Sequence, residues 1–508
     1  MERELLRADA IEARSVKTHC PYCAFQCGMT VTRSPDDGGS LRVSGDEEFP
    51  VNRGQMCIKG FTSAQLLQRP DRLTSPIVRD RAGRRTNVAW DAALDFIARR
   101  LVEVRADHGP EAVAVFGSGA LTNEKAYLLG KFARVALRSP NIDYNGRYCM
   151  ASAAAGQLRA FGVDRGLPFP VSDIARAGTL ALWGSNCADT MPPIMQWVRE
   201  QRERGGASIV VDPRRTETAR SATLHLQLTP GTDLALANGL LHIALVEGLI
   251  DHAYIRDRTT GFDSVRRDVL SSDPAQVERL TGVSIEDQVR AVRLLASRES
   301  GMVLSGRGPE QQSKGTDTVS ALINLMLALG RVGKPFSGYG CLTGQGNGQG
   351  GREHGQKAGQ LPGYRRTDDP EHRAAIARVW GVDADALQGE GKSAYELLDS
   401  IGEIGGIRAL LVFGSNVAVA SPNATNIERK LRALDLLVVC DAFENETSEA
   451  AHAILPVAQW AEEEGTMTNL EGRVILRQKV KPSPEGVGTD IDVLCGLAAR
   501  LGVGDKFQ

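Results

Sequence analysis

The chain has 508 residues, 42% of them hydrophobic, and its 60 Lys and Arg residues nearly balance 62 Asp and Glu residues, giving a net charge of -2 at pH 7. This length is too great for a single hydrophobic core, so we expect several domains. The balanced charge gives no electrostatic reason for binding to nucleic acid or to a membrane surface, so we expect neither as a partner.

The N-terminal segment M-E-R-E-L-L-R-A-D-A contains acidic residues and no long apolar stretch, and it lacks the paired arginines of an export signal. We therefore predict a cytoplasmic protein. The most apolar segments, 234–250 and 321–329, are too short or too interrupted by polar residues to span a membrane. We predict that both are helices packed on a core.

Three cysteines, Cys20, Cys23 and Cys27, follow a C-x2-C-x3-C pattern, and Cys57 stands alone further on. Four thiolates suit either a cubane iron–sulfur cluster or a tetrahedral zinc ion. The isolated fourth cysteine favours the cluster, because zinc sites more often use two C-x2-C pairs, but zinc remains the alternative. A fifth cysteine, Cys149, lies in N-G-R-Y-C-M and could bind a second metal supplied with electrons by the cluster.

The other cysteines are Cys187, Cys341, Cys440 and Cys495. Their scattered positions, and the odd total of nine, fit a reducing compartment better than a disulfide framework. We predict that these four are small buried hydrophobic residues.

Short apolar runs alternate with longer helical patterns along the chain. This alternation predicts parallel sheets covered by helices. The predicted strands are 112–116, 180–183, 208–211, 409–413 and 436–439. Between Ser337 and Gly363 the glycine content is too high for either helix or strand, and we predict a long loop that lines a pocket through Arg352, Glu353 and His354.

One pattern occurs twice. A-L-W-G-S-N-C-A-D-T-M-P-P starts at Ala181 and L-V-F-G-S-N-V-A-V-A-S-P-N at Leu411; in both cases a later strand ends at an aspartate, Asp212 or Asp441. A small turn after a strand can bring phosphate to backbone amides, and the aspartate can bind a ribose or a guanine. A single G-S-N is usually only a turn, but the repeat favours two nucleotide-binding halves.

These motifs together resemble the molybdopterin oxidoreductases of the dimethyl-sulfoxide-reductase superfamily, and within it the cytoplasmic assimilatory nitrate reductases. The resemblance rests on T-H-C-P-Y-C-A-F-Q-C-G, C-I-K-G, N-G-R-Y-C-M-A-S-A, W-G-S-N, T-P-G-T-D, L-T-G-Q-G-N-G-Q-G-G-R-E-H-G and E-E-E-G-T-M-T-N-L-E-G-R. It implies an α/β enzyme with a small N-terminal iron–sulfur domain followed by two interleaved doubly wound domains.

The resemblance also implies the cofactors. Cys20, Cys23, Cys27 and Cys57 would hold a 4Fe-4S cluster, and Cys149 would bind molybdenum carried by two molybdopterin guanine dinucleotides. Lys59 would lie between the cluster and a pterin. The implied cofactor contacts are Lys59, Asn145, Trp183, Gly184, Ser185, Asn186, Cys187, Ala188, Asp189, Thr190, Asp212, Pro213, Arg214, Gly231, Thr232, Asp233, Gln311, Gln345, Asn416, Asp441 and Asp490.

For the substrate pocket we predict Met150 and Arg352, with Gln345 as a further candidate. The forked donors of an arginine suit a planar oxyanion such as nitrate, and Arg147 could fill this role instead of Arg352. Formate dehydrogenases of the superfamily have a histidine directly after the metal ligand, whereas this chain has Met150. We therefore predict reduction of nitrate to nitrite by oxygen-atom transfer.

Formate oxidation on the same cofactor, and a partial subunit, are the alternatives. Family members continue into a C-terminal domain that completes the pterin site, so a separate chain could supply it. The electron donor would be ferredoxin, flavodoxin or a flavoprotein. His354 and Gly346 differ from the residues that the resemblance leads us to expect in the glycine-rich loop. His354 could donate a proton in the pocket, and the alternative is a histidine that is simply exposed to water.

The predicted domains are an iron–sulfur domain at 15–75, a discontinuous nucleotide-binding domain at 76–140 plus 400–508, and an inserted domain at 141–399 that carries Cys149. The first G-S-N turn then belongs to the inserted domain and the second to the discontinuous one. The cofactor is expected in the cleft between them, outside the carboxyl ends of both sheets.

Overall fold

The computed structural model describes residues 14–33, 40–80 and 82–507. The first ten residues, on which the predicted location partly rests, lie outside this range. Within the described residues, none of the helices combines the length and the apolar character needed to cross a membrane.

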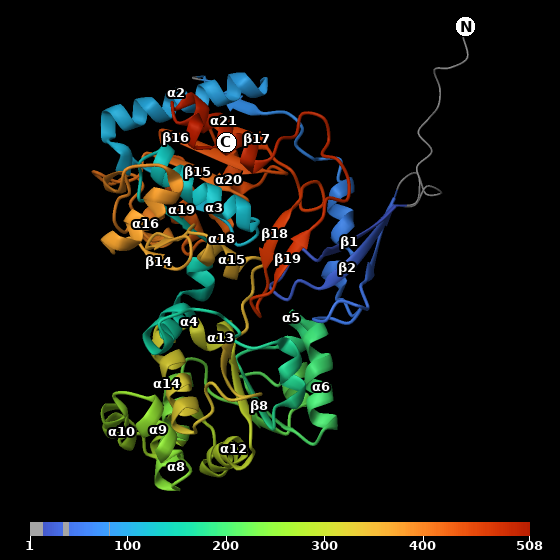
Figure 1. Cartoon of the computed structure of the whole chain (residues 1–508), viewed down its shortest axis with the longest axis vertical. Helices are drawn as coiled ribbons and strands as arrows, with labels where there is room; N and C mark the ends of the chain where they lie inside the picture. The colour runs from blue at the N-terminus through green and yellow to red at the C-terminus, as the bar shows by residue number, and fades with distance from the viewer. Residues whose placement is uncertain (1–13, 34–39, 81, 508) are drawn as a thin grey trace, which may run out of the picture.

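The N-terminal part is a three-stranded antiparallel sheet (Figure 1). It consists of β1 (Arg14–His19), β2 (Gly28–Arg33) and β3 (Leu41–Gly45). Because His19 pairs with Gly28 across β1 and β2, the loop that joins these strands holds all three cysteines of the first motif. Cys57 directly precedes the short helix α1 (Ile58–Phe61).

A seven-stranded sheet forms the upper half of the molecule in Figure 1. Its central strands are parallel, and β4 and β5 extend one edge in antiparallel pairing. In spatial order the strands are β5 (Arg85–Asn87), β4 (Ile77–Arg79), β17 (Ala453–Pro456), β16 (Leu436–Asp441), β15 (Ala409–Phe413), β6 (Val113–Gly117) and β7 (Ile142–Tyr144). Sequence segments about 300 residues apart therefore share one sheet.

Helices cover both faces of this sheet. Along β6, Val113 and Val115 belong to one apolar cluster and Ala114 and Phe116 to the other, as expected when successive side chains point to opposite faces. The first cluster includes α2 (Trp90–His108), α3 (Asn123–Lys131), α16 (Pro370–Trp380) and α21 (Asp490–Arg500). The second includes α17 (Ala394–Asp399), α18 (Val417–Ala420) and α19 (Ala424–Leu431).

A five-stranded, fully parallel sheet forms the second α/β unit, in the lower half of Figure 1. Its order is β10 (Leu224–Leu226), β9 (Ala207–Val211), β8 (Thr179–Trp183), β11 (Gly301–Ser305) and β12 (Gly338–Cys341). One face packs on α4 (Gly146–Phe161), α8 (Asp233–Val246), α9 (His252–Arg258), α10 (Phe262–Leu270), α11 (Pro274–Thr281), α12 (Ile285–Ser297) and α14 (Gly315–Ala328).

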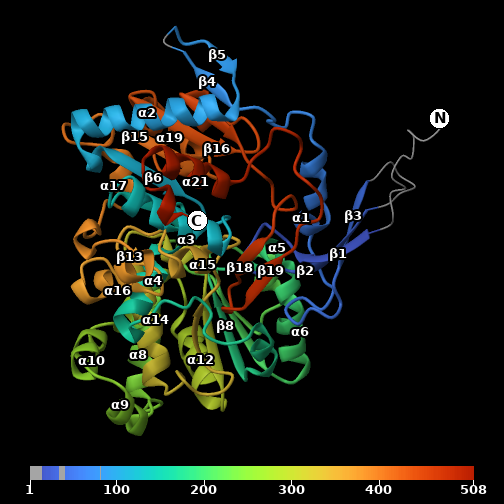
Figure 2. The same cartoon turned by 45° about the horizontal axis from the view of Figure 1, so that its top comes forward.

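The other face of the five-stranded sheet packs on α6 (Met195–Glu203) and on the N-terminal sheet. Leu180 and Leu182 of β8 share one apolar cluster with Phe25, Met29 and the α6 residue Trp197, so the cysteine-bearing loop is fixed against this unit. Figure 2 shows the N-terminal sheet beside α6 and beside the hairpin β18–β19. The hairpin strands are β18 (Gly465–Thr468) and β19 (Val474–Arg477).

The remaining elements are short. They are α5 (Cys187–Thr190), α7 (Glu217–Arg220), α13 (Arg307–Glu310), α15 (Gly348–Glu353), α20 (Glu446–Glu449), β13 (Gln360–Leu361) and β14 (Arg365–Arg366). All five predicted strands are confirmed, as β6, β8, β9, β15 and β16, and so are the parallel pairing and the α/β class. The predicted core helices are α8 and part of α14.

The structure differs from the expected arrangement at two points. The glycine-rich segment 337–363 is not purely a loop, because β12, α15 and β13 lie within it. In addition, 142–144, 361–387 and α17 fall in the predicted inserted domain, yet β7 pairs with β6, Leu361, Ile376 and Leu387 join one core of the seven-stranded sheet, and α17 packs on its other face. The unit on which such a segment packs depends on contacts with residues distant in the sequence. The local sequence does not indicate these contacts.

Candidate functional site

The four N-terminal cysteines lie together at one end of the three-stranded sheet. The backbone N–H of Cys20 donates to the carbonyl oxygen of Cys27 at 2.8 Å, which closes the loop. Helix α1 packs against it, since a Cβ added at Gly60 would lie 3.6 Å from Cys20 Sγ. Cys57 at the start of α1 is therefore held against the same loop.

Burial and mutual proximity raise the pKa of the Cys20, Cys23 and Cys27 thiols and so disfavour their ionised form. Burial, with smaller contributions from the neighbouring Cys23 and Cys57, raises the pKa of Cys20 to about 12. The pKa of Cys27 is raised by burial and then by Cys23, Cys20 and Cys57. Metal cations replace the thiol protons when such a group binds a cluster. Among the described residues, no three His, Cys, Asp or Glu side chains converge closely enough to hold a single metal ion.

Lys59 connects the cysteine group to the first repeated turn. Its Nζ donates to the carbonyl oxygen of Thr190, at the end of α5, at 2.9 Å. Lys59 also opposes the rise in the pKa of both Cys20 and Cys23. A cation in this position stabilises negative charge that arrives on a group bound by these thiols.

The glycine-rich segment bridges the cysteine loop and Cys149. The N–H of Ala24 donates to the carbonyl oxygen of Gly344 at 3.0 Å, and Gln26 Nε2 donates to that of Gly346 at 2.5 Å. On the other side, a Cβ at Gly344 would lie 3.7 Å from Cys149 Sγ. One turn of backbone therefore contacts both predicted metal-binding groups.

Cys149 lies on the first turns of α4, which begins after Asn145. The N–H of Gly119 donates to Asn145 Oδ1 at 3.0 Å, which ties the start of α4 to the end of β6. Cys149 is half-buried and faces an open pocket of about 190 Å³ that also contains Arg147, Glu310 and Gln311. Met150 is buried, with 3% of its surface exposed.

Arg307, which the sequence reasoning missed, reaches Cys149 from α13. Its Nη1 lies 3.5 Å from Cys149 Sγ and 2.5 Å from Met150 Sδ, and its Nη2 lies 2.7 Å from Cys341 Sγ. The guanidinium also forms an ion pair with Glu310. The available signal was an Arg and a Glu three residues apart, directly after the apolar run G-M-V-L-S. Cys341 is buried as predicted, but it adjoins this site.

Arg352, the predicted oxyanion-binding residue, is already paired. Its Nε lies 2.6 Å from Asp164 Oδ2, and both side chains are almost fully buried. Its Nη1 and Nη2 donate to the carbonyl oxygen of Gly348 at 2.8 Å and to Gln349 Oε1 at 2.7 Å. Arg147 is likewise engaged, with Nε 2.7 Å from Asp143 Oδ2. The geometry therefore leaves no nitrogen of Arg352 free for an anion, whereas Arg147 is engaged through its Nε and lines the pocket at Cys149.

The other candidates in the glycine-rich segment differ. Gln345 lies beside Gly119, and its Oε1 is buried without a hydrogen-bond partner in the part of the chain that the structure describes. His354 is half-buried at the end of α15, and its Nδ1 donates to the carbonyl oxygen of Gly350 at 2.7 Å. His354 therefore closes its own helix, which does not favour a role in proton delivery.

The two G-S-N turns have the same geometry. Gly184 and Gly414 both adopt a left-handed conformation, with φ of 62° and 60°, directly after β8 and β15. The Oγ1 of Thr218 donates to Asn186 Oδ1 at 2.7 Å and accepts from the N–H of Ala188 at 3.0 Å.

Thr447 makes the matching pair of bonds in the second turn, to Asn416 Oδ1 at 2.8 Å and from the N–H of Ala418 at 3.0 Å. The repeat in the sequence thus corresponds to a repeat in three dimensions, located at the carboxyl ends of two different parallel sheets. Such turns are common nucleotide sites in α/β proteins.

The aspartates that follow the next strands also correspond. Asp212 follows β9 and accepts from the N–H of Arg214 at 2.8 Å; Asp441 ends β16 and accepts from Asn445 Nδ2 at 2.8 Å. Burial raises the pKa of Asp441. Both lie next to their turn, since β9 pairs with β8 and β16 with β15.

The remaining predicted contacts fall into the same two groups. Trp183 Nε1 donates to Asp233 Oδ1 at 2.8 Å, and this places the Gly231–Asp233 segment beside the first turn. Gln311 Nε2 donates to the carbonyl oxygen of Tyr148 at 2.7 Å, next to Cys149. Asp490, by contrast, accepts a buried hydrogen bond from Lys125 Nζ at 2.5 Å, although its Oδ1 has no partner in the described chain.

The donor set fits the implied cofactors. Buried polar atoms without a partner occur in many parts of the described chain, and five of them lie on the segments around the turns and Cys149: Ser415 Oγ, Thr343 Oγ1, Gln345 Oε1, Arg307 Nε and Asp490 Oδ1. Orphaned polar atoms at a buried site are unfavourable unless a ligand or water satisfies them. A polar, hydrogen-bonding cofactor would do so, and the clustered thiols suit soft metals.

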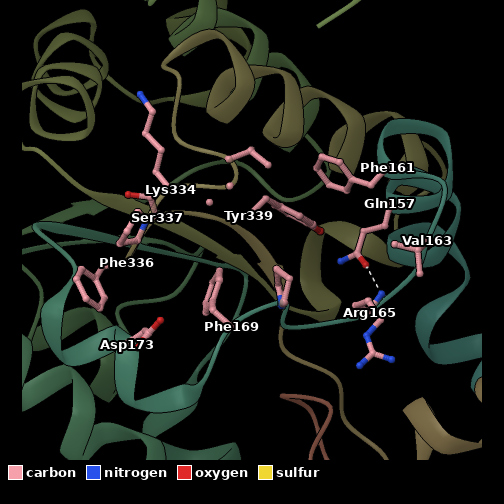
Figure 3. A pocket seen from close by; sticks show the side chains of 15 residues that line it. Gln157, Phe161, Val163, Arg165, Phe169, Asp173, Lys334, Phe336, Ser337 and Tyr339 are labelled. Atoms are coloured by element: carbon pink, nitrogen blue, oxygen red, sulfur yellow. Dashed lines mark hydrogen bonds between the residues drawn. The ribbon is translucent and has the colours of Figure 1, made fainter. Parts of the chain in front are cut away.

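A larger cavity, of about 300 Å³, lies elsewhere in the five-stranded unit (Figure 3). Phe161, Phe169 and Phe336 line it, and the N–H of Arg165 donates to Gln157 Oε1 at 3.0 Å at one end. The lining includes no predicted cofactor or metal contact.

Comparison with known proteins agrees with this site. Residues 72–500 match the molybdopterin oxidoreductase family model, and residues 13–69 match the model of the molybdopterin oxidoreductase Fe4S4 domain. The Fe4S4 match favours a 4Fe-4S cluster over zinc at the first four cysteines. A solved structure, acetylene hydratase from Pelobacter acetylenicus, aligns with a TM-score of 0.80 at 21% identity over 97% of this chain and 70% of that one, and this likeness shows the fold.

Two curated relatives show how activities vary around this sequence. The chain is 43% identical over 500 residues to the assimilatory nitrate reductase catalytic subunit of Bacillus subtilis, covering 98% of this chain and 70% of that protein. It is 33% identical over 499 residues to the F420-dependent formate dehydrogenase subunit alpha of Methanocaldococcus jannaschii, covering 98% and 72%.

Proposed function

The chain belongs to the molybdopterin oxidoreductase family, and within this family we propose that it reduces nitrate to nitrite. The observation that carries the proposal is the setting of Cys149. Its thiol lies beside the guanidinium of Arg307 and the thioether of Met150, with no histidine at the following position. The nitrate reductase among the relatives, the more similar of the two described, supports the same assignment.

The residues that would hold the cofactors follow from the geometry. Cys20, Cys23, Cys27 and Cys57 would bind the 4Fe-4S cluster, and Cys149 would bind molybdenum. The two repeated turns, with Asp212 and Asp441, would each hold one guanine dinucleotide half of the pterin cofactor. When bound, the molybdenum centre supplies the two-electron oxygen-atom transfer chemistry.

The polypeptide itself would provide the path for electrons and the positive charge that stabilises the anionic substrate. Electrons would pass from the cysteine loop toward Cys149 along the Gly344–Gly346 contact, because this segment touches both groups, and Lys59 would hold positive charge between the cysteines and the first G-S-N turn. Nitrate loses one oxygen as its N–O bond breaks, takes up two electrons and two protons, and leaves as nitrite and water. A fixed cation at the pocket stabilises the anionic substrate without reorganising during the reaction.

The domain organisation and the partners complete the proposal. We assign the iron–sulfur domain to 15–75, and the discontinuous and inserted domains to 76–140 plus 400–508 and 141–399, with β7, 361–387 and α17 packed on the discontinuous one. The electron donor would be ferredoxin, flavodoxin or a flavoprotein reductase. The cytoplasm is the location that fits such donors.

Formate oxidation is the competing function, supported by the formate dehydrogenase among the relatives. The test is a viologen assay on protein purified without air, with iron, molybdenum and zinc measured on the same sample. Reduced viologen with nitrate should yield nitrite, and oxidised viologen with formate should stay oxidised. Formate-dependent viologen reduction would favour the competitor, and loaded protein without nitrite formation would contradict the proposal.

A further inference from the structure

We infer that Arg307 is the residue that holds the substrate oxyanion beside Cys149, a role for which the sequence favours Arg352. The inference rests on the proposed function and deepens it, by assigning recognition of a small planar anion to one side chain. The distance of 3.5 Å between Arg307 Nη1 and Cys149 Sγ places a permanent cation at the thiol.

Two of the three guanidinium nitrogens of Arg307, Nη1 and Nε, lack oxygen acceptors in the part of the chain that the structure describes. Its Nη1 contacts only the sulfur atoms of Cys149 and Met150, and its Nε has no partner within the described part of the chain. Thiol and thioether sulfur are weak acceptors. Neither of these two nitrogen atoms has an oxygen acceptor among the described residues, whereas all three nitrogens of Arg352 face oxygen atoms of Asp164, Gly348 and Gln349.

The third nitrogen of Arg307 fixes its orientation. Nη2 pairs with Glu310, whose Oε1 accepts from Ser305 Oγ at 2.5 Å, and Ser305 in turn bonds the hydroxyl of Tyr339 at 2.7 Å. All three partners are buried. A guanidinium held at one edge by a buried network can present its other donors in one direction, as an oxyanion site requires.

The backbone around Arg307 is fixed against the first G-S-N turn. The N–H of Gly306 donates to the carbonyl oxygen of Trp183 at 2.8 Å, and a Cβ at Gly306 would lie only 2.6 Å from the carbonyl oxygen of Gly184. Arg307 thus lies between that turn and Cys149, which is the place where a substrate would meet the metal.

The test compares Arg307→Met with wild type. Methionine keeps the length of the side chain and removes its charge, so the nitrate KM should rise about 10- to 100-fold. The value of kcat should change much less, and iron and molybdenum contents and the EPR signal of the reduced cluster should be unchanged. Isothermal titration of oxidised protein with nitrate, which involves no turnover, should show the same loss of affinity.

Arg307→Lys, which keeps the charge but loses the fork, should fall between the two, and it carries the test if the methionine variant loses molybdenum. Arg366→Met, at an exposed arginine paired with Asp368, is the control and should keep the wild-type KM. Wild-type KM and nitrate affinity in the Arg307 variants would overturn this inference alone. Absence of nitrite formation by wild type would instead overturn the proposed function.

Discussion

Arg352 and Asp164 form an ion pair in which Nε and Oδ2 are 2.6 Å apart and both side chains are almost completely buried. The nearby Asp164 raises the pKa of Arg352, although burial opposes this, so the guanidinium stays charged. The pair joins the glycine-rich segment to the loop that follows α4. We expect this buried pair to contribute to the stability of the folded protein.

We expect Arg352→Gln to destabilise the protein by about 3–5 kcal/mol, because it leaves the Asp164 carboxylate buried without its partner. Thermal unfolding should show a clearly lower midpoint. Arg366→Gln, which breaks the exposed pair with Asp368, should cost no more than about 1 kcal/mol. A stable Arg352→Gln protein with only a raised nitrate KM would return this arginine to the substrate site.

The repeated turns predict a matched pair of effects. Thr218→Val and Thr447→Val each remove one hydroxyl that both donates to an asparagine and caps a backbone N–H. We expect each to cost roughly 1–3 kcal/mol and to reduce molybdenum retention to a similar extent. Unfolding and metal analysis of both variants would check this, with Thr86→Val on the exposed β5 as control. An effect in only one half would contradict the equivalence.

His452 predicts a pH dependence of stability. Burial lowers its pKa, as do Arg100 and Arg79, against the opposing Asp435. Its Nδ1 accepts from the N–H of Leu437 at 3.0 Å, which requires that atom to be unprotonated. The folded pKa therefore lies below the unfolded value of about 6.5.

The contribution of His452 is present above that unfolded value and is lost as the pH falls below it, because the unfolded chain takes up the proton first. His452→Gln keeps an acceptor without titrating, so urea unfolding at pH 7.5 and 5.5 should show a smaller loss than in wild type. His372→Gln, at a more exposed histidine, is the control. Equal losses in wild type and His452→Gln would count against this account.

The position of Arg477 predicts an effect on the reduction potential of the cluster. This buried arginine, on the strand that packs beside β1, contacts Met467 Sδ at 2.5 Å, and its Nε has no partner in the described chain. Burial lowers its pKa to about 10, opposed by the charges of Glu463 and Cys20. Its positive charge should therefore favour the reduced cluster.

Arg477→Met should lower the midpoint potential of the cluster by on the order of 50 mV in an EPR-monitored titration. Lys479→Met removes an equal charge from an exposed position nearby and should leave the potential almost unchanged, since water screens it. Equal potentials in wild type and Arg477→Met would show that this arginine does not act on the cluster.

Much of this architecture is readable from local patterns. The β-branched runs at 208–211 and 436–439 are strands, and the two G-S-N turns have equivalent geometry, because a strand, a left-handed glycine and an asparagine cap are local requirements. The cysteine spacing predicts a metal-binding group, and the register of β1 and β2 places Cys20, Cys23 and Cys27 in the one loop that joins these strands.

Other features depend on contacts between distant segments. The approach of Arg307 to Cys149 joins residues 158 positions apart, and the sequence around Arg307 indicates only an ion pair with Glu310. Likewise, nothing near Arg352 reveals that Asp164 satisfies it. Glycine content alone also failed to predict α15, where tertiary contacts such as the bond from Asn347 Nδ2 to the carbonyl oxygen of Leu121 outweigh weak helix propensity.

The most direct test of the whole account is a single-turnover experiment without an external reductant. Protein purified without air is reduced, freed of reductant, and mixed with nitrate while the EPR signal of the cluster is followed. We predict that the signal disappears in wild type, with one nitrite formed for every two electrons lost, and that it persists in Cys149→Ser. A cluster that stays reduced in wild type, or one that nitrate oxidises equally well in Cys149→Ser, would contradict the proposed route from the N-terminal cysteines to Cys149.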